Sequence, residues 1–379
     1  MKNSLWTNVE VENATNALTT GVLWNAEGIC IDSRKVQPRD IFVAFKGNRV
    51  DGHSYVLDAF KKGAVAAIVE REIEGLKEEN PLLIVENVQE ALAQLACSAR
   101  NRSAADVIAI TGSVGKTSSK NLLAKALSQF DSVHSTIGNL NNHIGAPLTL
   151  ARLNVSSRFA VFELGMNHSG EIELLSKLIR PKVAMITNVH GVHLEQLKTE
   201  RAVAEAKGEI FQGLTEGGSV VLNQDNAWTE FLKSDAKKRD IQKIITFGED
   251  IKSDLQLVEW QPRKEKSLVT IKHDRKTYKY VLSENGKHRA LNSIGVLACV
   301  HALGLDIERA AESFKEIATP IGRGGQSNIP LPNGGAFCLI DESYNASPVA
   351  MKAAFSVLKT MNPDVGGRKL IVIGDMLEL

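Results

Sequence analysis

The stretch VIAITGSVGKTSSKNLL, residues 107–123, constrains the fold more than any other part of the chain. An apolar run that predicts a strand ends at Ile110, a turn of glycines and hydroxyls follows, and a predicted helix begins near Lys116. In this arrangement, successive backbone N–H groups and a helix N-terminus cradle phosphates. We therefore expect a nucleoside triphosphate to bind at Gly112, Ser113, Val114, Gly115, Lys116 and Thr117.

Lys116 would reach the terminal phosphates, and the Thr117 hydroxyl would face a magnesium ion. The general phosphate-loop pattern GxxxxGK[ST] has a glycine where this chain has Ile110. The alternative is a glycine turn that only joins a strand to a helix. The apolar strand before the turn and the helix after it favour phosphate binding.

Short apolar strands alternate with helical patterns along the chain, which is typical of α/β proteins with a parallel sheet. The predicted strands cover residues 40–45, 64–69, 81–87, 107–111, 159–165, 183–189 and 217–223. Alternating polar and apolar residues over 254–282 predict an antiparallel ribbon. The glycine and proline cluster at 319–335 predicts a linker, followed by a strand at 336–343, a helix after Pro348 and a strand at 369–375.

The length of 379 residues exceeds one ordinary hydrophobic core. We expect three domains, at 1–103, 104–320 and 321–379, with the first boundary in the polar stretch 98–106. The net charge of +1 gives no basic excess for nucleic acid, and the apolar runs are too short to span a bilayer. The four scattered cysteines indicate small buried side chains in a reducing compartment. We expect a cytoplasmic monomer with no nucleic-acid or membrane partner.

Two features suggest a metal beside the phosphates. Glu163 ends an apolar strand, where ligands bind in open α/β sheets, although a solvated strand end is an equal alternative. His190 and His193 have a spacing that suggests zinc, but one HxxH without further paired ligands disfavours it. Either histidine fits beside a phosphate-bound magnesium ion instead.

Lys207 lies on the apolar face of a predicted helix in TERAVAEAKGEIFQGL. One interpretation is snorkelling, with a buried stem and a charged head in water. The other is a partly buried amine with a lowered pKa that acts as a nucleophile. Such an amine reacts with carbon dioxide to give a carbamate, which is an anionic metal ligand.

Several motifs together resemble the Mur ligase family over essentially the whole chain. They are IDSRKVQPRDIFVAFKG, TGSVGKTSSK, GNLNNHIGAPLTL, FELGMNHSGEI, ITNVHGVHLE, AEAKGEIF, GKHRALNSIG, GRG and DESYNASPVAM. The resemblance implies an N-terminal domain that binds a UDP-linked substrate, a central parallel-sheet P-loop ATPase domain and a C-terminal Rossmann-like domain. Because VIGDMLEL falls early in the family's third domain, we expect that domain to be truncated here.

The resemblance also implies roles for single residues. Lys116, Glu163, His193 and Lys207 would take part in catalysis, with Thr117, Glu163, His193 and carbamylated Lys207 as magnesium ligands. Asn292 would contact adenine, and Arg323 and Asp341 would lie near the phosphates and ribose. The substrate-binding residues would be Ser33, Arg34, Lys46 and Gly47 at the UDP end, Asn139 and Asn142 in the central cleft, and Tyr344 and Asn345 near the acceptor.

The implied reaction is ATP-dependent addition of D-alanyl-D-alanine to UDP-N-acetylmuramoyl-tripeptide through an acyl phosphate. GNLNNHIGAPLTL and SYNASP indicate this step, whereas Glu342 and Ser347 stand where the family commonly has aspartate and asparagine. One alternative is a family member that adds a single amino acid. The other is a truncated, non-catalytic protein that binds nucleotide or a UDP-sugar.

Overall fold

The computed structural model describes residues 4–19, 22–47, 50–77, 79–192, 194–263, 266–317, 319–332, 334–363 and 365–376. The chain divides into two compact units. The first unit comprises Met1–Ala105 and Thr136–Ala160, and the second comprises Asp106–Ser135 and Val161–Leu379. Within the described residues, no helix is both long and apolar enough to cross a membrane.

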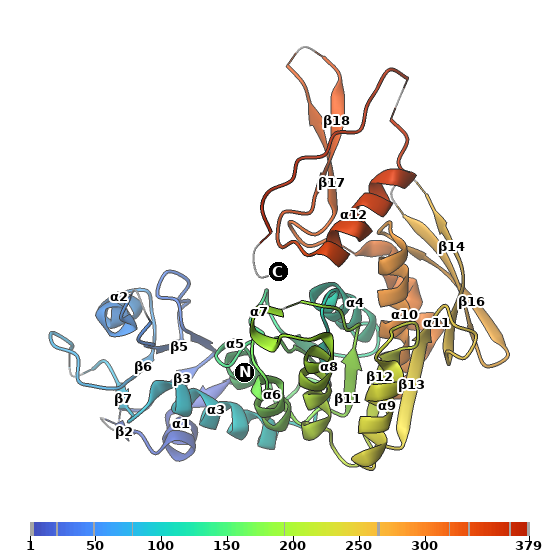
Figure 1. Cartoon of the computed structure of the whole chain (residues 1–379). Helices are drawn as coiled ribbons and strands as arrows, with labels where there is room; N and C mark the ends of the chain where they lie inside the picture. The colour runs from blue at the N-terminus through green and yellow to red at the C-terminus, as the bar shows by residue number, and fades with distance from the viewer. Residues whose placement is uncertain are drawn as a thin grey trace. The chain divides into compact units, whose positions relative to one another are not determined.

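The first unit contains a five-stranded sheet of order β2-β7-β6-β5-β4, in which β4, β5, β6 and β7 run parallel and β2 is antiparallel (Figure 1). The strands of this sheet are β2 (Leu18–Thr19), β4 (Gly28–Cys30), β5 (Asp40–Val43), β6 (Ala66–Val69) and β7 (Leu82–Ile84). A separate antiparallel pair is formed by β1 (Trp6–Thr7) and β3 (Asn25–Ala26). The helices of the first unit are α1 (Asn8–Thr15), the 3-10 helix η1 (Gly52–Tyr55), α2 (Val56–Lys61), α3 (Val88–Arg102) and α5 (Gly145–Ala151). The strands predicted at 40–45, 64–69 and 81–87 are thus confirmed in shorter form.

Trp6 fixes the start of the chain inside the first unit. Its ring is fully buried, its indole N–H donates to Ala151 O at 2.9 Å, and the Arg102 guanidinium lies 3.8 Å from the ring centre. Arg102 also donates to Leu5 O at 2.6 Å and forms an ion pair with Glu10 at 3.0 Å. Helix α3 extends to Arg102, so the polar stretch 98–106, where we placed the first domain boundary, is mostly helical.

The second unit is built on a nine-stranded sheet of order β16-β15-β14-β13-β12-β11-β8-β10-β9. Its strands are β8 (Asp106–Thr111), β9 (Val133–Ser135), β10 (Phe159–Glu163), β11 (Val183–Ile186), β12 (Ser219–Asn223), β13 (Lys243–Gly248), β14 (Leu255–Pro262), β15 (Ser267–His273) and β16 (Lys276–Leu282). β10 and β11 are buried throughout, and β8 and β12 along most of their length, as expected for strands covered on both faces. The antiparallel pairs β14–β15 and β15–β16 confirm the ribbon predicted from alternation.

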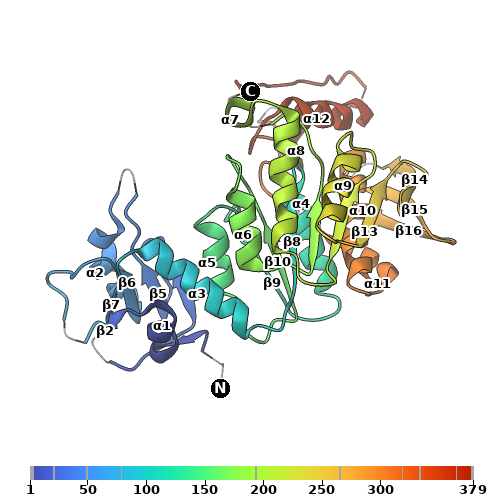
Figure 2. The same ribbon diagram turned by 60° about the horizontal axis from the view of Figure 1, so that its bottom comes forward.

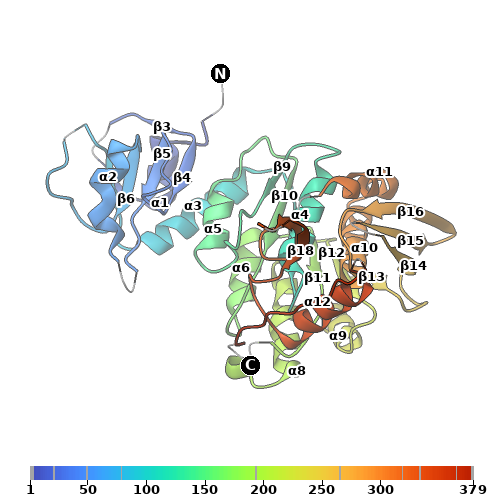
Figure 3. The same cartoon turned by 90° about the horizontal axis from the view of Figure 1, so that it is seen from above.

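Helices cover both faces of this sheet, as Figure 2 and Figure 3 show. Helices α6, α8 and α9 lie on one face, and α4 and α10 pack together on the other. Their bounds are α4 (Lys116–Leu127), α6 (Glu171–Ile179), α7 (Leu194–Leu197), α8 (Glu200–Gly208), η2 (Glu209–Gly213), α9 (Thr229–Lys238), α10 (Lys287–Ala302), α11 (Ile307–Glu312) and η3 (Ser313–Glu316). The α/β class and the central parallel sheet are therefore confirmed.

The last part of the second unit contains the hairpin β17 (Gly325–Pro330) and β18 (Ala336–Asp341), followed by α12 (Pro348–Thr360). The helix after Pro348 is confirmed, and the Ser347 side chain caps it by accepting from Ala350 N at 3.2 Å. Two expectations are wrong. Residues 325–330 of the predicted linker form β17, because β18 supplies its pairing partner. Residues 369–375 form no strand, since no described segment pairs with them.

Candidate active site

The loop after β8 requires glycine at two positions. Gly112 and Gly115 have φ values of +148° and +84°, which L side chains rarely adopt. A Cβ atom on Gly112 would lie 1.9 Å from Thr187 Oγ1, and one on Gly115 would lie 2.6 Å from Asn292 Nδ2. Because these glycines let the backbone pass so close to its neighbours, the chain can turn directly from the end of β8 into the N-terminus of α4.

The segment after β11 holds the loop in this shape. Val114 N donates to Asn188 Oδ1, and Asn188 Nδ2 donates back to Val114 O, both at 3.0 Å. Thr187 Oγ1 donates to the same carbonyl at 2.7 Å. Ser113 Oγ donates to His190 O at 3.0 Å and accepts from His190 N at 2.9 Å. The loop is therefore preorganised, and Thr187 and Asn188 are functional residues that the sequence did not predict, although both directly follow a buried strand.

Lys116 is half-buried at the start of α4. Its Nζ donates to Gly112 O at 2.7 Å and lies 3.4 Å from Ser113 O. Burial lowers the pKa of this amine, the negative charge of Glu163 opposes that effect, and the positive charge of Arg323 adds to it. The end of β10, which carries Glu163, and the region of Arg323 therefore act on the same ammonium group as the loop.

Two further lysines are buried near this site. Lys120, one turn along α4, is 2% exposed, and its pKa is lowered by burial and partly restored by Glu163. Lys207 on α8 is also 2% exposed, and its pKa is lowered well below 10.5, first by burial and then by the charge of Lys116. The snorkelling interpretation of Lys207 is thus wrong, because the side chain as a whole is almost entirely buried. So many buried cationic groups favour a polyanionic ligand.

Glu163 is 2% exposed, so the solvated strand end is also wrong. Thr111, the last residue of β8, is 1% exposed, and its hydroxyl has no hydrogen-bond partner within the described structure. Thr117, at the first turn of α4, is also buried. Among the described residues, no group of three or more His, Cys, Asp or Glu side chains could hold a metal. His193 lies outside the described residues, and His190 is half-buried, with a pKa lowered by burial.

Helix α10 brings a second set of residues to the loop. The side-chain amide of Asn292 lies against Gly115, since a Cβ atom on Gly115 would be only 2.6 Å from its Nδ2. Arg289, which the sequence did not predict, donates to Ser118 Oγ at 2.7 Å and to Arg323 O, and forms an ion pair with Glu284 at 3.3 Å. Arg289 and Glu284 are 8% and 9% exposed at their side chains. One buried guanidinium therefore links α4 to the glycine-rich segment around residue 323.

The predicted residues of the last segment lie together at the base of the β17–β18 hairpin. The Arg323 guanidinium lies 4.1 Å from the centre of the Tyr344 ring, and Tyr344 N donates to Gly322 O at 3.0 Å. Asp341 Oδ1 accepts from Ser343 N at 3.0 Å. Hydrogen bonds from the Ser343 hydroxyl and from the Ser343 amide lower the pKa of Asp341. The side chain of Asn345 accepts from Ala346 N at 2.9 Å.

The remaining predicted residues belong to the first unit. Arg34 donates twice to Asp32, both times at 2.9 Å, and this contact lowers the Asp32 pKa to about 2. Ser33 O accepts from Lys62 Nζ at 2.7 Å. The other four residues lie in two turns of this unit, Lys46 and Gly47 after β5, and Asn139 and Asn142 before α5.

Asn142 has a structural role in its turn. Its Oδ1 accepts from Ile144 N at 3.2 Å and Gly145 N at 2.8 Å, which satisfies amides at the start of α5. Asn139 contributes its carbonyl, which accepts from Asn141 N at 2.8 Å.

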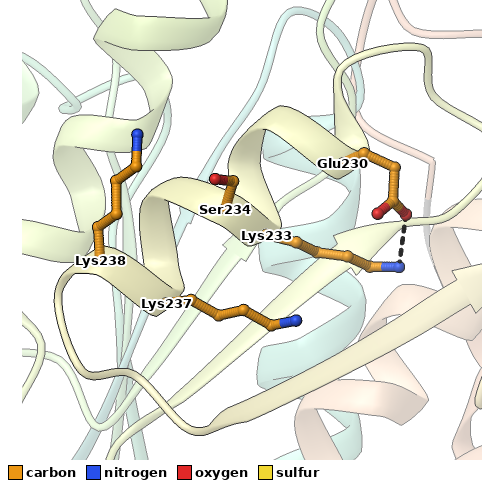
Figure 4. A pocket seen from close by; sticks show the side chains of 5 residues that line it. All are labelled: Glu230, Lys233, Ser234, Lys237 and Lys238. Atoms are coloured by element: carbon orange, nitrogen blue, oxygen red, sulfur yellow. Dashed lines mark hydrogen bonds and ion pairs between the residues drawn. The ribbon is translucent and has the colours of Figure 1, made fainter.

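A shallow hollow of about 400 Å³ lies along α9 (Figure 4). It is lined by Glu230, Lys233, Ser234, Lys237 and Lys238, and Lys233 pairs with Glu230 at 2.9 Å. None of these five residues is a predicted site residue, and all of them belong to one helix face.

Comparison with known proteins agrees with this geometry. Residues 110–300 match the Mur ligase middle domain, and residues 25–100 match the catalytic domain of the Mur ligase family. The UDP-N-acetylmuramoyl-tripeptide–D-alanyl-D-alanine ligase of Rickettsia prowazekii is 37% identical over 355 residues, which are 94% of this chain and 77% of that protein.

Solved structures give the same result. A crystal structure of MurF from Acinetobacter baumannii matches with a TM-score of 0.83 at 32% identity, over 94% of this chain and 77% of the other. MurF ligase from Thermotoga maritima in complex with ADP matches with a TM-score of 0.73 at 27% identity, over 88% of this chain and 74% of the other. The chain belongs to the Mur ligase family.

Proposed function

We propose that this chain is an ATP-dependent ligase that adds D-alanyl-D-alanine to UDP-N-acetylmuramoyl-tripeptide during synthesis of peptidoglycan precursors. The observation that carries the reaction class is the preorganised loop after β8, with Lys116 at its end and the buried lysines Lys120 and Lys207 near it. The substrates follow from the relatives named for this reaction, which are similar over more than nine tenths of the chain.

The reaction has two steps. The terminal carboxylate of the tripeptide attacks the γ-phosphorus of ATP, so that a carboxyl–phosphate bond forms and the bond to ADP breaks. The amine of D-alanyl-D-alanine then attacks the acyl carbon, loses a proton and displaces inorganic phosphate. Phosphoryl transfer depends mainly on positioning and charge neutralisation, which amides and lysines at the loop supply.

The chain's residues divide these tasks. The N-terminus of α4 and Lys116 bind the β- and γ-phosphates of ATP and neutralise the charge that develops during transfer. Asn292, which lies against Gly115, contacts adenine, while Arg323 and Asp341 contact phosphate and ribose. The UDP end binds Ser33, Arg34, Lys46 and Gly47; Asn139 and Asn142 contact the rest of the first substrate, and Tyr344 and Asn345 contact the dipeptide.

Magnesium fits the donor set of this site. Thr117 and Glu163 offer the oxygen ligands that Mg²⁺ prefers. The buried hydroxyl of Thr111, at the end of β8, has no hydrogen-bond partner among the described residues and offers a third oxygen. When bound, Mg²⁺ would neutralise phosphate charge. A neutral Lys207 amine can add carbon dioxide and release one proton, which gives a carbamate; its burial and lowered pKa support this modification. His193 completes the proposed ligands, Thr117, Glu163, His193 and Lys207.

The test is ADP release by the chain supplied with ATP, Mg²⁺ and UDP-N-acetylmuramoyl-tripeptide, with and without D-alanyl-D-alanine. We expect release to require the dipeptide and to fall about 100-fold or more in Lys116→Met, because that change removes a cation from the transferred phosphate. Lys238→Met, at an exposed position on α9, is the matched control and should retain full activity.

Other outcomes identify the alternatives. Release that depends on a single amino acid instead of the dipeptide would indicate the related ligase. Bound ATP with no ADP release under any of these conditions would indicate a non-catalytic nucleotide-binding protein.

A further inference from the structure

The turn after β5 is closed by its own backbone. Gly47 N donates to Val50 O at 2.9 Å, Gly52 N donates to Phe45 O at 2.8 Å, and Lys46 forms an antiparallel bridge with Asp51. A Cβ atom on Gly52 would lie 2.6 Å from Phe45 O, so the two arms of the turn are in close contact. Lys46 and Gly47 themselves are exposed.

His53 lies buried directly behind this turn, at 2% exposure. Its Nε2 accepts a hydrogen bond from Glu70 N at 2.9 Å, so this nitrogen carries no proton. Its Nδ1 lies 2.7 Å from Asp51 Oδ1 and is therefore the protonated nitrogen, which donates to the carboxylate. The two contacts together fix one neutral tautomer and one ring orientation.

Asp51 gathers three donors at the end of the turn. Besides His53 Nδ1, it accepts from His53 N at 3.0 Å and from Arg71 Nη2 at 2.8 Å. These contacts, that of Arg71 first, hold the pKa of Asp51 well below its usual range. Because Glu70 and Arg71 directly follow β6, they connect the turn to a central strand of the first unit. Glu70 Oε1 also accepts from Val88 N at 3.1 Å, which extends the connection to the start of α3.

We propose that His53 is a positioning residue for the UDP-linked substrate, because it fixes Asp51 to β6 and thereby holds Lys46 and Gly47 in the geometry that the UDP end requires. This inference rests on the proposed function, which assigns those two residues to the UDP end. Neither ring nitrogen of His53 is available to a ligand, so it acts on the substrate only through Asp51.

Two variants of the full chain separate the two ring contacts. In His53→Gln, the side-chain oxygen can replace Nε2 as the acceptor for Glu70 N, but the donor to Asp51 is lost. In His53→Asn, the side-chain amide can replace Nδ1 as the donor to Asp51, but the buried Glu70 N–H loses its acceptor. Lys61→Gln, which removes an exposed ion pair with Asp58 on the neighbouring helix α2, is the control.

We expect His53→Gln to raise the KM for UDP-N-acetylmuramoyl-tripeptide about tenfold, as for loss of one hydrogen bond to a charged group, with kcat and the KM for ATP within about twofold. His53→Asn should leave all KM values near those of the parent and lower the melting temperature instead, because it leaves a buried amide without an acceptor. Lys61→Gln should change none of these quantities.

Lys46→Ala distinguishes failure of the inference from failure of the proposed UDP site. If Lys46→Ala raises the KM for the UDP-linked substrate and His53→Gln does not, the positioning role is refuted while the site stands. The positioning role is equally refuted if His53→Gln raises the KM for ATP to the same extent, since the effect is then general. If Lys46→Ala leaves the KM unchanged, the assignment of the UDP end fails and the inference fails with it.

Discussion

Gly115→Ala is expected to weaken nucleotide binding through Asn292, in addition to destabilising the fold. Gly115 caps α4 at φ +84°, so any L side chain there adopts the left-handed conformation, which costs about 1–2 kcal/mol. The new methyl group would also lie 2.6 Å from Asn292 Nδ2 and 3.0 Å from Oδ1. The first cost concerns stability, whereas the second concerns the position of a predicted adenine contact.

Gly170 offers a control in the same unit. It caps α6 at φ +88°, without a side-chain cap, as Gly115 does for α4. A Cβ atom on Gly170 would meet nothing within 4 Å. Gly170→Ala therefore carries the same backbone cost without the collision, and the difference between the two variants isolates the displacement of Asn292.

The size of that difference follows from the contact distance. Nonbonded contacts of this kind settle near ~3.5 Å, so the Asn292 amide must move by about 1 Å. Such a shift would break the proposed hydrogen bond to adenine, which would contribute about 0.5–1.5 kcal/mol and correspond to roughly two- to twelvefold weaker binding. Both variants should share a loss of about 1–2 kcal/mol in the free energy of unfolding.

The assay is calorimetric titration with ADP, combined with urea unfolding of the same preparations. We expect weaker ADP binding in Gly115→Ala only, and Asn292→Ala should reproduce that loss. The double variant of Gly115 and Asn292 should lose no more affinity than either single variant, because both act through one contact. Equal ADP affinity in Gly115→Ala and Gly170→Ala, or additive losses in the double variant, would refute this reasoning.

Two further predictions concern buried charges. Because the Lys207 pKa is lowered below 10.5, the unfolded chain binds a proton that the native chain lacks, so the free energy of unfolding falls as pH drops below 10.5. Lys207→Met should make the free energy of unfolding depend less on pH, as measured by urea unfolding in carbon dioxide-free buffer. An unchanged pH dependence would contradict this prediction. Arg289→Met leaves Glu284 buried without its 3.3 Å partner and should cost about 3–5 kcal/mol in the same assay. Adding Glu284→Gln should recover part of the lost free energy of unfolding, because it removes the unpaired charge. If nothing is recovered, the loss of the ion pair is not the cause.

The predictable features are those that depend on local pattern. Buried strands read as continuous apolar runs, so β8, β10, β11 and β12 were predicted near their observed positions. The loop was predicted because glycine spacing and a following helix are encoded within a dozen residues. Pattern failed where a partner decides the outcome: β17 lies in a glycine-rich stretch that reads as a linker, and only its pairing with β18 makes it a strand.

Lys207 shows the same limit for a single side chain. Its helical periodicity placed it on the apolar face but could not decide between a head in water and a buried amine. That choice depends on the surroundings of the head group, which include the charge of Lys116, some ninety positions earlier in the chain. Arg289 was missed for a related reason, since its partners Ser118 and Arg323 lie on other elements.

The register of the central sheet explains why the loop motif contains glycine at position 112. β8 and β11 pair in parallel with Thr111 opposite Ile186, so the next residues, Gly112 and Thr187, face each other where the strands end. A side chain at 112 would occupy the space of the Thr187 hydroxyl, which donates to Val114 O and so shapes the loop. Gly112 therefore permits both the backbone turn and the hydrogen bond from Thr187 to Val114 O. The loop motif therefore contains only part of the site, because the residues that hold the loop in shape begin at Thr187, seventy-five positions after Gly112.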